Sequence, residues 1–211
     1  QFMPDAIDKF VVFWNNRNAR RKMPASLIYY FNEFLDRVGR DKAQLIMHTD
    51  PYDPNGPNLE EIIHNLGLTN GEIKFSNKKV EPQQLAMMYN LADVTINIAD
   101  AEGFGLSTLE SLSCGTPIIV NMTGGLQEQV TDGENWFGIG LQPSAKAIIG
   151  SQDIPYIYED RVAQNDVVDA LEDFYNRREE LPEIGLMGRQ HVLKNYNYKD
   201  FGKKWDSLIR S

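Results

Sequence analysis

Two glutamates, Glu102 and Glu110, enclose a glycine-containing segment whose residue types suit ligand binding. The preceding residues, Val94 to Ile98, form an apolar run typical of a buried strand, whereas Leu106 to Ser113 has the spacing of a helix. The glycines would therefore lie at the N-terminus of that helix. Free backbone N–H groups and the positive end of the helix dipole bind anions there, and glycine lets an anion approach the backbone. The predicted chemistry is the binding of a phosphate or diphosphate.

The two carboxylates predict that the ligand also carries hydroxyl groups. They would repel a diphosphate unless they bind another part of the same molecule, and the vicinal hydroxyls of a sugar are good donors to carboxylate oxygens. Two alternatives stay open. A glutamate in the first turns of a helix is favourable for the helix dipole alone, which applies to Glu110. Asp100 and Glu102 are also the residue types of a paired-carboxylate Mg²⁺ site, although this short segment shows no further oxygen ligands.

The densest basic cluster of the sequence lies between residues 15 and 22, after the first predicted strand and before the first predicted helix. This position places it at the same sheet edge as the two glutamates. Arg17 can form forked hydrogen bonds with a diphosphate, and Lys22 can act as a point charge beside it. The alternative is a solvated basic loop in an acidic protein. Together with the glutamates, the cluster favours a diphosphate site.

Strand-like and helical segments alternate along most of the chain. The expected strands are residues 10–14, 44–48, 72–75, 94–98, 117–121, 138–141 and 154–158, and the expected helices between them are residues 24–40, 58–65, 81–91, 106–113 and 126–130. This order predicts the α/β class, with a parallel sheet covered by helices on both faces and ligands at the carboxyl ends of the strands. After Gln164 the pattern is purely helical, and the last helix carries an apolar stripe.

Composition limits the remaining possibilities. A chain of 211 residues with 42% hydrophobic and 24% charged residues matches one ordinary domain. The net charge of −9 argues against a nucleic-acid partner, because such binding depends on many Lys and Arg contacts to phosphates. The single cysteine, Cys114, cannot form an internal disulfide or a multi-cysteine metal site. The residues before Asp8 look like a linker, so we expect a fragment of a longer protein.

Four motifs in the sequence resemble one known family. They are residues 102–110 (EGFGLSTLE), 114–120 (CGTPIIV), 124–128 (GGLQE) and 132–133 (DG). Together they are similar to the C-terminal, donor-binding domain of retaining GT-B-fold glycosyltransferases of the group 1 (family 4) type. The resemblance covers most of the chain from Phe10 to Gly133. It departs from the family at Ile98-Ala99, where Pro-Ser is frequent, and in a segment from Gly138 to Asp166 that is longer than the usual linker.

The resemblance implies a Rossmann-like three-layer α/β/α domain over residues 1–211, the C-terminal half of a GT-B fold. Residues 196–211 would form a strap helix that crosses back to an N-terminal acceptor domain, which this sequence lacks. It implies a nucleotide-diphosphosugar donor, UDP-, GDP- or ADP-linked, and retaining transfer of a hexose to a glycan, lipid or protein acceptor, with no metal or other cofactor. The isolated domain is expected to be inactive in transfer.

The resemblance also implies roles for individual residues. Arg17 and Lys22 match the diphosphate-binding Arg and Lys of the family and would stabilise the leaving diphosphate, so with Glu102, which would contact the donor sugar near its reacting carbon, they form the expected catalytic set. Glu110 would hold the ribose of the nucleotide. The remaining expected substrate-binding residues are Gly103, Phe104, Gly105, Leu106 and Ser107 around the diphosphate, and Lys79 and Val80 beside the nucleobase.

Two other functions are alternatives to sugar transfer. A non-catalytic α/β nucleotide-binding or interaction module could keep the fold and lack transfer. An NAD-dependent oxidoreductase is disfavoured, because Thr108 stands where the dinucleotide fingerprint has its third glycine and the next strand ends in Asn121 rather than an acid. We expect a cytoplasmic location, with peripheral attachment to a membrane through the missing domain left open.

Overall fold

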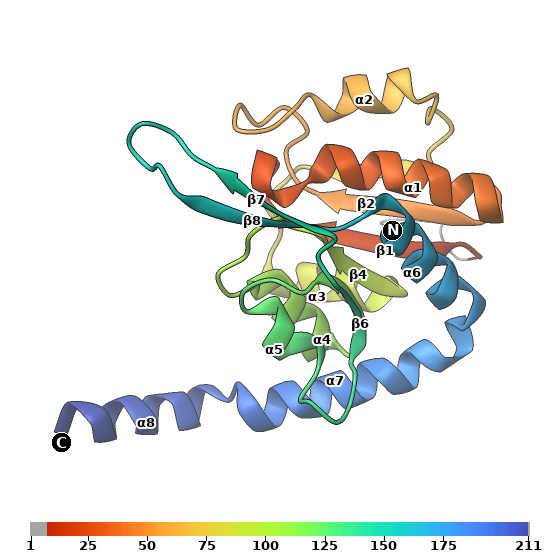
Figure 1. Ribbon diagram of the computed structural model, residues 1–211. Helices are drawn as coiled ribbons and strands as arrows, with labels where there is room; N and C mark the ends of the chain where they lie inside the picture. The colour runs from red at the N-terminus through yellow and green to blue at the C-terminus, as the bar shows by residue number, and fades with distance from the viewer. Residues whose placement is uncertain (1–7, 211) are drawn as a thin grey trace.

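The computed structural model describes residues 8–210, so the expected linker before Asp8 lies outside the described residues. A parallel sheet of six strands forms its centre, in the order β3-β2-β1-β4-β5-β6 (Figure 1). The strands are β1 (Phe10–Asn15), β2 (Ala43–His48), β3 (Ile73–Ser76), β4 (Val94–Asn97), β5 (Ile118–Asn121) and β6 (Gly138–Leu141). This is the strand order of a Rossmann fold, and it confirms the predicted α/β class.

The central strands are apolar throughout because helices cover both faces of the sheet. In β1, alternate side chains point to opposite faces: Phe10, Val12 and Trp14 join one buried cluster, while Val11 and Phe13 join another. All five are between 0% and 3% exposed. The sequence therefore reads as a continuous hydrophobic run rather than as an alternating one.

Helices α1 (Pro24–Val38), α2 (Leu59–Asn65) and α6 (Gln164–Asn176) contribute to the cluster on the first face. Helices α3 (Pro82–Leu91), α4 (Leu106–Cys114), α5 (Leu126–Val130) and α7 (Leu181–Asn195) contribute to the clusters on the second face. Two short 3-10 turns, η2 (Arg20–Lys22) and η3 (Arg178–Glu180), precede α1 and α7. Figure 1 shows α1 and α2 above the sheet and α4, α5 and α7 below it.

A hairpin follows β6 and projects away from the body of the domain (Figure 1). It consists of β7 (Ala145–Ile149) and β8 (Ile157–Arg161), which pair antiparallel in a separate two-stranded sheet. The sequence predicted one strand here, at residues 154–158. The structure places that strand three residues later and adds a partner, since the pairing of Ile148 with Tyr158 depends on a chain reversal that no local pattern announces.

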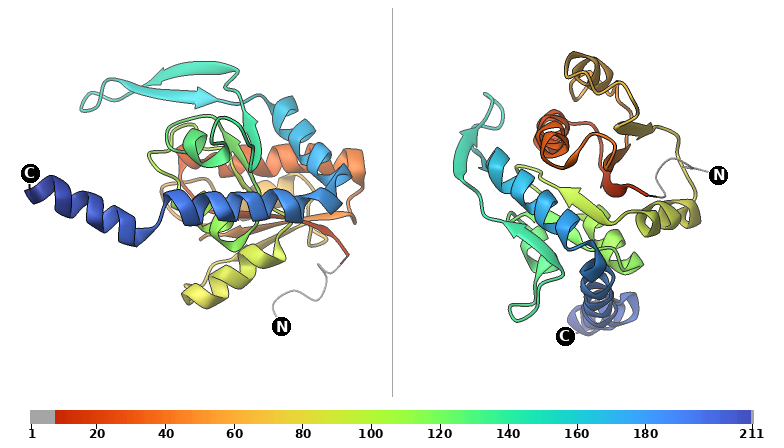
Figure 2. Two further views of the ribbon diagram at one scale, coloured as in Figure 1. Left: turned by 90° about the horizontal axis from the view of Figure 1, so that it is seen from below. Right: turned by 90° about the vertical axis from the view of Figure 1, so that its right-hand side faces the viewer.

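The last helix, α8 (Tyr198–Arg210), confirms a helix within the expected strap of residues 196–211, whose final residue lies outside the described part. It contains no buried residue and extends away from the other elements (Figure 2). Phe201, Trp205, Leu208 and Ile209 of its apolar stripe are 58%, 50%, 65% and 77% exposed. A crossing to another domain remains a prediction.

Between residues 8 and 210, no helix combines the length and the apolar character needed to cross a membrane.

Candidate functional site

Helix α4 begins at Leu106 because Gly105 turns the chain with a left-handed backbone, at φ 87°. A Cβ atom on Gly105 would lie 2.5 Å from Leu126 Cδ2 and 2.8 Å from Thr108 Oγ1, so a side chain fits neither the conformation nor the space. Thr108 Oγ1 donates to the Gly105 carbonyl at 2.8 Å. The N-terminus of α4 therefore follows β4 through a tight glycine turn, as the sequence predicted.

A second glycine turn supports the first. A Cβ on Gly124, whose φ is 50°, would lie 1.7 Å from the Glu102 carbonyl oxygen, and one on Gly125 would lie 2.7 Å from the Phe104 carbonyl oxygen. The Gly125 N–H donates to the Gly103 carbonyl at 3.2 Å. This direct packing of backbone on backbone fixes the path of the loop that carries Glu102.

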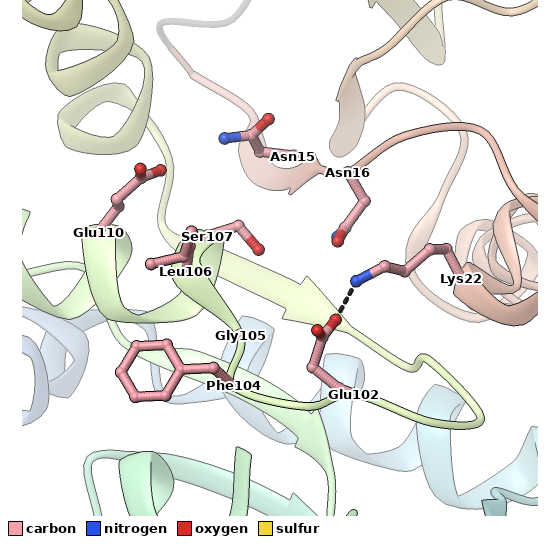
Figure 3. A pocket seen from close by; sticks show the side chains of 9 residues that line it. All are labelled: Asn15, Asn16, Lys22, Glu102, Phe104, Gly105, Leu106, Ser107 and Glu110. Atoms are coloured by element: carbon pink, nitrogen blue, oxygen red, sulfur yellow. Dashed lines mark hydrogen bonds and ion pairs between the residues drawn. The ribbon is translucent and has the colours of Figure 1, made fainter. Parts of the chain in front are cut away.

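A cavity of about 380 Å³ opens beside the α4 N-terminus (Figure 3). Its lining comes from the end of β1, the turn η2, the loop after β4 and the first turns of α4. The lining residues are Asn15, Asn16, Lys22, Glu102, Phe104, Gly105, Leu106, Ser107 and Glu110. The structure thus brings together seven of the expected site residues from two segments about 80 positions apart in the sequence.

Lys22 and Glu102 form an ion pair at one end of this cavity (Figure 3). Lys22 Nζ donates to Glu102 Oε2, and the two side chains are only 10% and 11% exposed. Burial lowers the pKa of Lys22, while the hydrogen bond to Glu102 opposes that effect. Arg21 Nη1 lies 3.9 Å from the same carboxylate oxygen. The cavity therefore presents a cation and a carboxylate side by side, one able to bind phosphate oxygens and the other hydroxyls.

Glu110 is oriented at the other end of the cavity by a buried tyrosine. Tyr89 Oη donates to Glu110 Oε2 at 2.9 Å and accepts from Asn15 Nδ2 at 2.8 Å. Burial, reinforced by the neighbouring Glu110 charge, raises the pKa of Tyr89 well above its usual range, so it stays a donor. Asn15, Asn16 and Tyr89 were not predicted as site residues from the sequence. The two asparagines could have been found, because they lie at the carboxyl end of β1, at the same sheet edge as Glu102.

Arg17 lies outside the cavity lining. Its guanidinium donates to Asp53 through Nε at 2.6 Å and Nη2 at 3.2 Å, and its side chain is 64% exposed. These hydrogen bonds hold the pKa of Asp53 well below its usual range. Lys79, which is exposed, and Val80, which packs against the cluster around Phe13, are also outside the lining, as is Gly103.

The two carboxylates of the alternative Mg²⁺ site face different cations. Asp100 Oδ2 lies 3.9 Å from Arg161 Nε, whereas Glu102 binds Lys22. A shared metal would need both carboxylates to turn toward one point. This arrangement argues against that alternative.

Comparison with known proteins identifies the family. The family model described as "Glycosyl transferases group 1" matches residues 8–183. The D-inositol 3-phosphate glycosyltransferase of Paenarthrobacter aurescens is 28% identical over 136 residues, which is 64% of this chain and 28% of that protein. D-inositol 3-phosphate glycosyltransferase 2 of Catenulispora acidiphila is 29% identical over 158 residues, 71% of this chain and 36% of that protein. The chain therefore spans about a third of the length of these relatives.

Solved structures share the fold. Sucrose-phosphate synthase from Thermosynechococcus elongatus superposes with a TM-score of 0.76 at 22% identity, over 96% of this chain and 45% of that one. Anabaena HepE, solved with UDP and glucose, superposes with a TM-score of 0.76 at 17% identity, over 99% of this chain and 50% of that one. The C-terminal domain of the group 1 glycosyl transferase LpcC from Francisella tularensis superposes with a TM-score of 0.68 at 18% identity, over 90% of this chain and 87% of that one. The chain therefore belongs to the glycosyl transferases group 1 family and has the fold of the C-terminal domain of GT-B glycosyltransferases.

Proposed function

We propose that this domain binds a nucleotide-diphosphosugar and presents its sugar for retaining transfer to an acceptor. The observation that carries the proposal is the cavity in which the α4 N-terminus, the Lys22–Glu102 pair and Glu110 meet. Helix N-termini favour phosphate groups, and carboxylates favour hydroxyls. The solved complex of Anabaena HepE with UDP and glucose supports the same ligand class.

The diphosphate would lie against the backbone of Gly105, Leu106 and Ser107. Lys22 would stabilise the negative charge that develops on the leaving diphosphate. An ammonium has three donors, so Lys22 can bind a phosphate oxygen while it keeps its hydrogen bond to Glu102. The sugar would then lie beside Glu102, whose carboxylate accepts from its hydroxyls near the reacting carbon. These groups come from the protein itself, which fits transfer without a metal.

Glu110 would read the ribose of the nucleotide. Tyr89 occupies Glu110 Oε2, which leaves the other carboxylate oxygen for a ribose hydroxyl. The order of these groups along the cavity then matches the order of the parts of the ligand: ribose at Glu110, diphosphate at the start of α4 and sugar at Glu102 (Figure 3).

Arg17 would join the diphosphate by exchanging its partner. It now binds Asp53, and because the Arg17 side chain is 64% exposed, water screens this ion pair and its contribution to stability is small. A rotation of this exposed side chain would bring its guanidinium to the same edge as Lys22. Lys79 and Val80 would border the nucleobase.

The proposed partners are a UDP-, GDP- or ADP-linked sugar and an N-terminal domain that holds the acceptor. The chain alone would bind nucleotide and transfer no sugar, because acceptor positioning and closure of the cleft need the other domain. We propose a cytoplasmic location for the complete enzyme.

Nucleotide titration of the 211-residue chain tests the proposal. UDP, GDP and ADP are each compared with the matching monophosphate by thermal shift and calorimetry, and one diphosphate is expected to raise the melting temperature more than its monophosphate. Lys22→Met, which keeps an unbranched apolar stem, should abolish the difference. Lys42→Met, at the opposite end of the sheet, is the control. Equal shifts from diphosphates and monophosphates in the wild type would refute a diphosphate site.

A further inference from the structure

We infer that the β7–β8 hairpin holds the Lys22–Glu102 pair in place, with Glu159 as a positioning residue that acts through Arg20. The inference rests on the proposed function, because it assigns a role in diphosphate binding to a segment outside the cavity. This role would explain the segment between Gly138 and Asp166, which is longer than the usual linker of the family.

Glu159 is a buried residue in the middle of β8, paired with Ala147 of β7. Residues 150–158 are all exposed, whereas Glu159 is 1% exposed. Its carboxylate accepts a forked pair of hydrogen bonds from Arg20, with Nη1 to Oε2 at 3.0 Å and Nη2 to Oε1. Arg20 is the main cause of the lowered pKa of Glu159. A buried carboxylate stays charged only where such a partner meets it, so this contact is built into the fold.

Arg20 belongs to the same short turn as Lys22. Met23 closes this turn with its N–H donating to the Arg20 carbonyl at 3.0 Å, and Met23 has a left-handed backbone with φ 55° and ψ 37°. Within residues 8–210 it is the single residue other than glycine with a positive φ. Such a conformation is strained and persists only where its surroundings enforce it. The Arg20–Glu159 contact supplies that constraint two residues before Lys22.

The hairpin also fixes the backbone that leads to Glu102. The Asp160 N–H donates to the Asp100 carbonyl at 2.7 Å, and the Asp100 N–H donates to the Arg21 carbonyl at 2.9 Å. Arg21 Nη1 returns a hydrogen bond to the Ala101 carbonyl at 2.8 Å. Three segments that are distant in sequence are therefore joined at one point, and each member of the Lys22–Glu102 pair lies within two residues of it.

Asp160 is itself anchored to the central sheet. Its side chain accepts from Thr123 Oγ1 at 2.9 Å, and its carbonyl accepts from Asn121 Nδ2 at 2.6 Å. These bonds tie β8 to the end of β5 and to the second glycine turn. Strand β8 is thus fixed to the central sheet, and through Glu159 and Arg20 it can fix the position of the turn η2.

The Glu159→Gln variant tests the role of the carboxylate, because the amide keeps its shape and removes its charge. Affinity is measured by calorimetry on the whole chain, with the nucleoside diphosphate among UDP, GDP and ADP that binds the wild type most tightly and with its monophosphate. We expect the diphosphate affinity to fall about fivefold and the monophosphate affinity by less than about twofold, as a charged hydrogen bond is weakened. Glu172→Gln, which removes a carboxylate bound to Arg37 at 2.8 Å far from the cavity, should change neither.

A double-mutant comparison separates positioning from general stability. In an Arg20→Gln background, Glu159→Gln should cause no further loss of diphosphate affinity, since the effect passes through Arg20. If Glu159→Gln does not fold, Arg20→Lys takes its place, because lysine keeps the charge and loses the fork. Additive losses, or a folded Glu159→Gln chain with unchanged preference for the diphosphate, would overturn the inference alone. A wild-type chain without any diphosphate preference would overturn the proposed function and this inference with it.

Discussion

Replacing Asp100 with asparagine is expected to stabilise the domain at neutral pH. Asp100 is 1% exposed, and its Oδ2 accepts no hydrogen bond within the described part of the chain. Burial, followed by the nearby charge of Glu159, raises its pKa from 3.8 to about 6, although Arg161 and Arg20 oppose the shift. An asparagine resembles the neutral acid in shape and avoids the cost of a buried charge.

The sign and size of this stability change follow from the linkage between folding and the protonation of Asp100. Between pH 3.8 and about 6 the folded state keeps a proton on Asp100 that the unfolded state has released, so stability falls as the pH rises through this window. Above about pH 6 the folded state carries the full free-energy cost of the buried Asp100 charge. A shift of about 2 pKa units corresponds to about 3 kcal/mol. For a domain of this size, that would raise the melting temperature by roughly 6 to 12 °C.

Thermal and urea unfolding at pH 7.5 and pH 4.5, followed by circular dichroism, measures the effect. The stability gain of Asp100→Asn over the wild type should be about 3 kcal/mol at pH 7.5 and about a third of that at pH 4.5, where Asp100 is neutral in the folded wild type but largely ionised in the unfolded chain. Asp169→Asn, at an exposed carboxylate that binds Arg37, serves as the control and should show no such pH-dependent gain. A variant less stable than the wild type at pH 7.5 would show that the attraction of Arg161 outweighs burial, and would refute the reasoning.

Three further predictions concern the cavity and the last helix. A 2′,3′-dideoxy nucleotide should bind more weakly than its parent, and Glu110→Gln should narrow that gap, because the amide loses the charge-assisted bonds to the ribose; calorimetry that finds equal binding of both nucleotides to the wild type would reject the ribose role. In a full-length enzyme, Glu102→Gln should lower turnover at least about 100-fold with nearly unchanged nucleotide affinity, and a variant that unfolds but keeps the specific activity of its folded fraction would make Glu102 structural. The exposed stripe of α8 should promote self-association. Sedimentation should therefore show less association for Trp205→Glu than for Leu91→Glu, a similarly exposed residue of α3, and a strictly monomeric wild type would contradict this.

Structural features that depend on residues close together in the chain could be predicted from the sequence. Buried apolar runs predicted every strand of the central sheet to within one or two residues, and the glycine at residue 105 predicted the start of α4. Features that depend on distant partners were missed. Arg17 is drawn to Asp53 by a loop 36 positions away, and Glu110 is oriented by Tyr89 from another helix. The hairpin strand β7 has no buried residue, so its partner across a turn, rather than a buried apolar run of its own, decides its structure.

The pairing of β1 has a consequence for the way the chain folds. One neighbour of β1 is β2, but the other is β4, and Val12 pairs with Val94. Parallel pairing of such distant segments is slow, because the loop between them must close before the contact forms. During synthesis at about 5 to 20 residues per second, β1 therefore waits roughly 4 to 16 s for its second partner. Throughout that time the most apolar strand of the domain is an open sheet edge, which makes nascent chains that end before β4 the species most prone to aggregate.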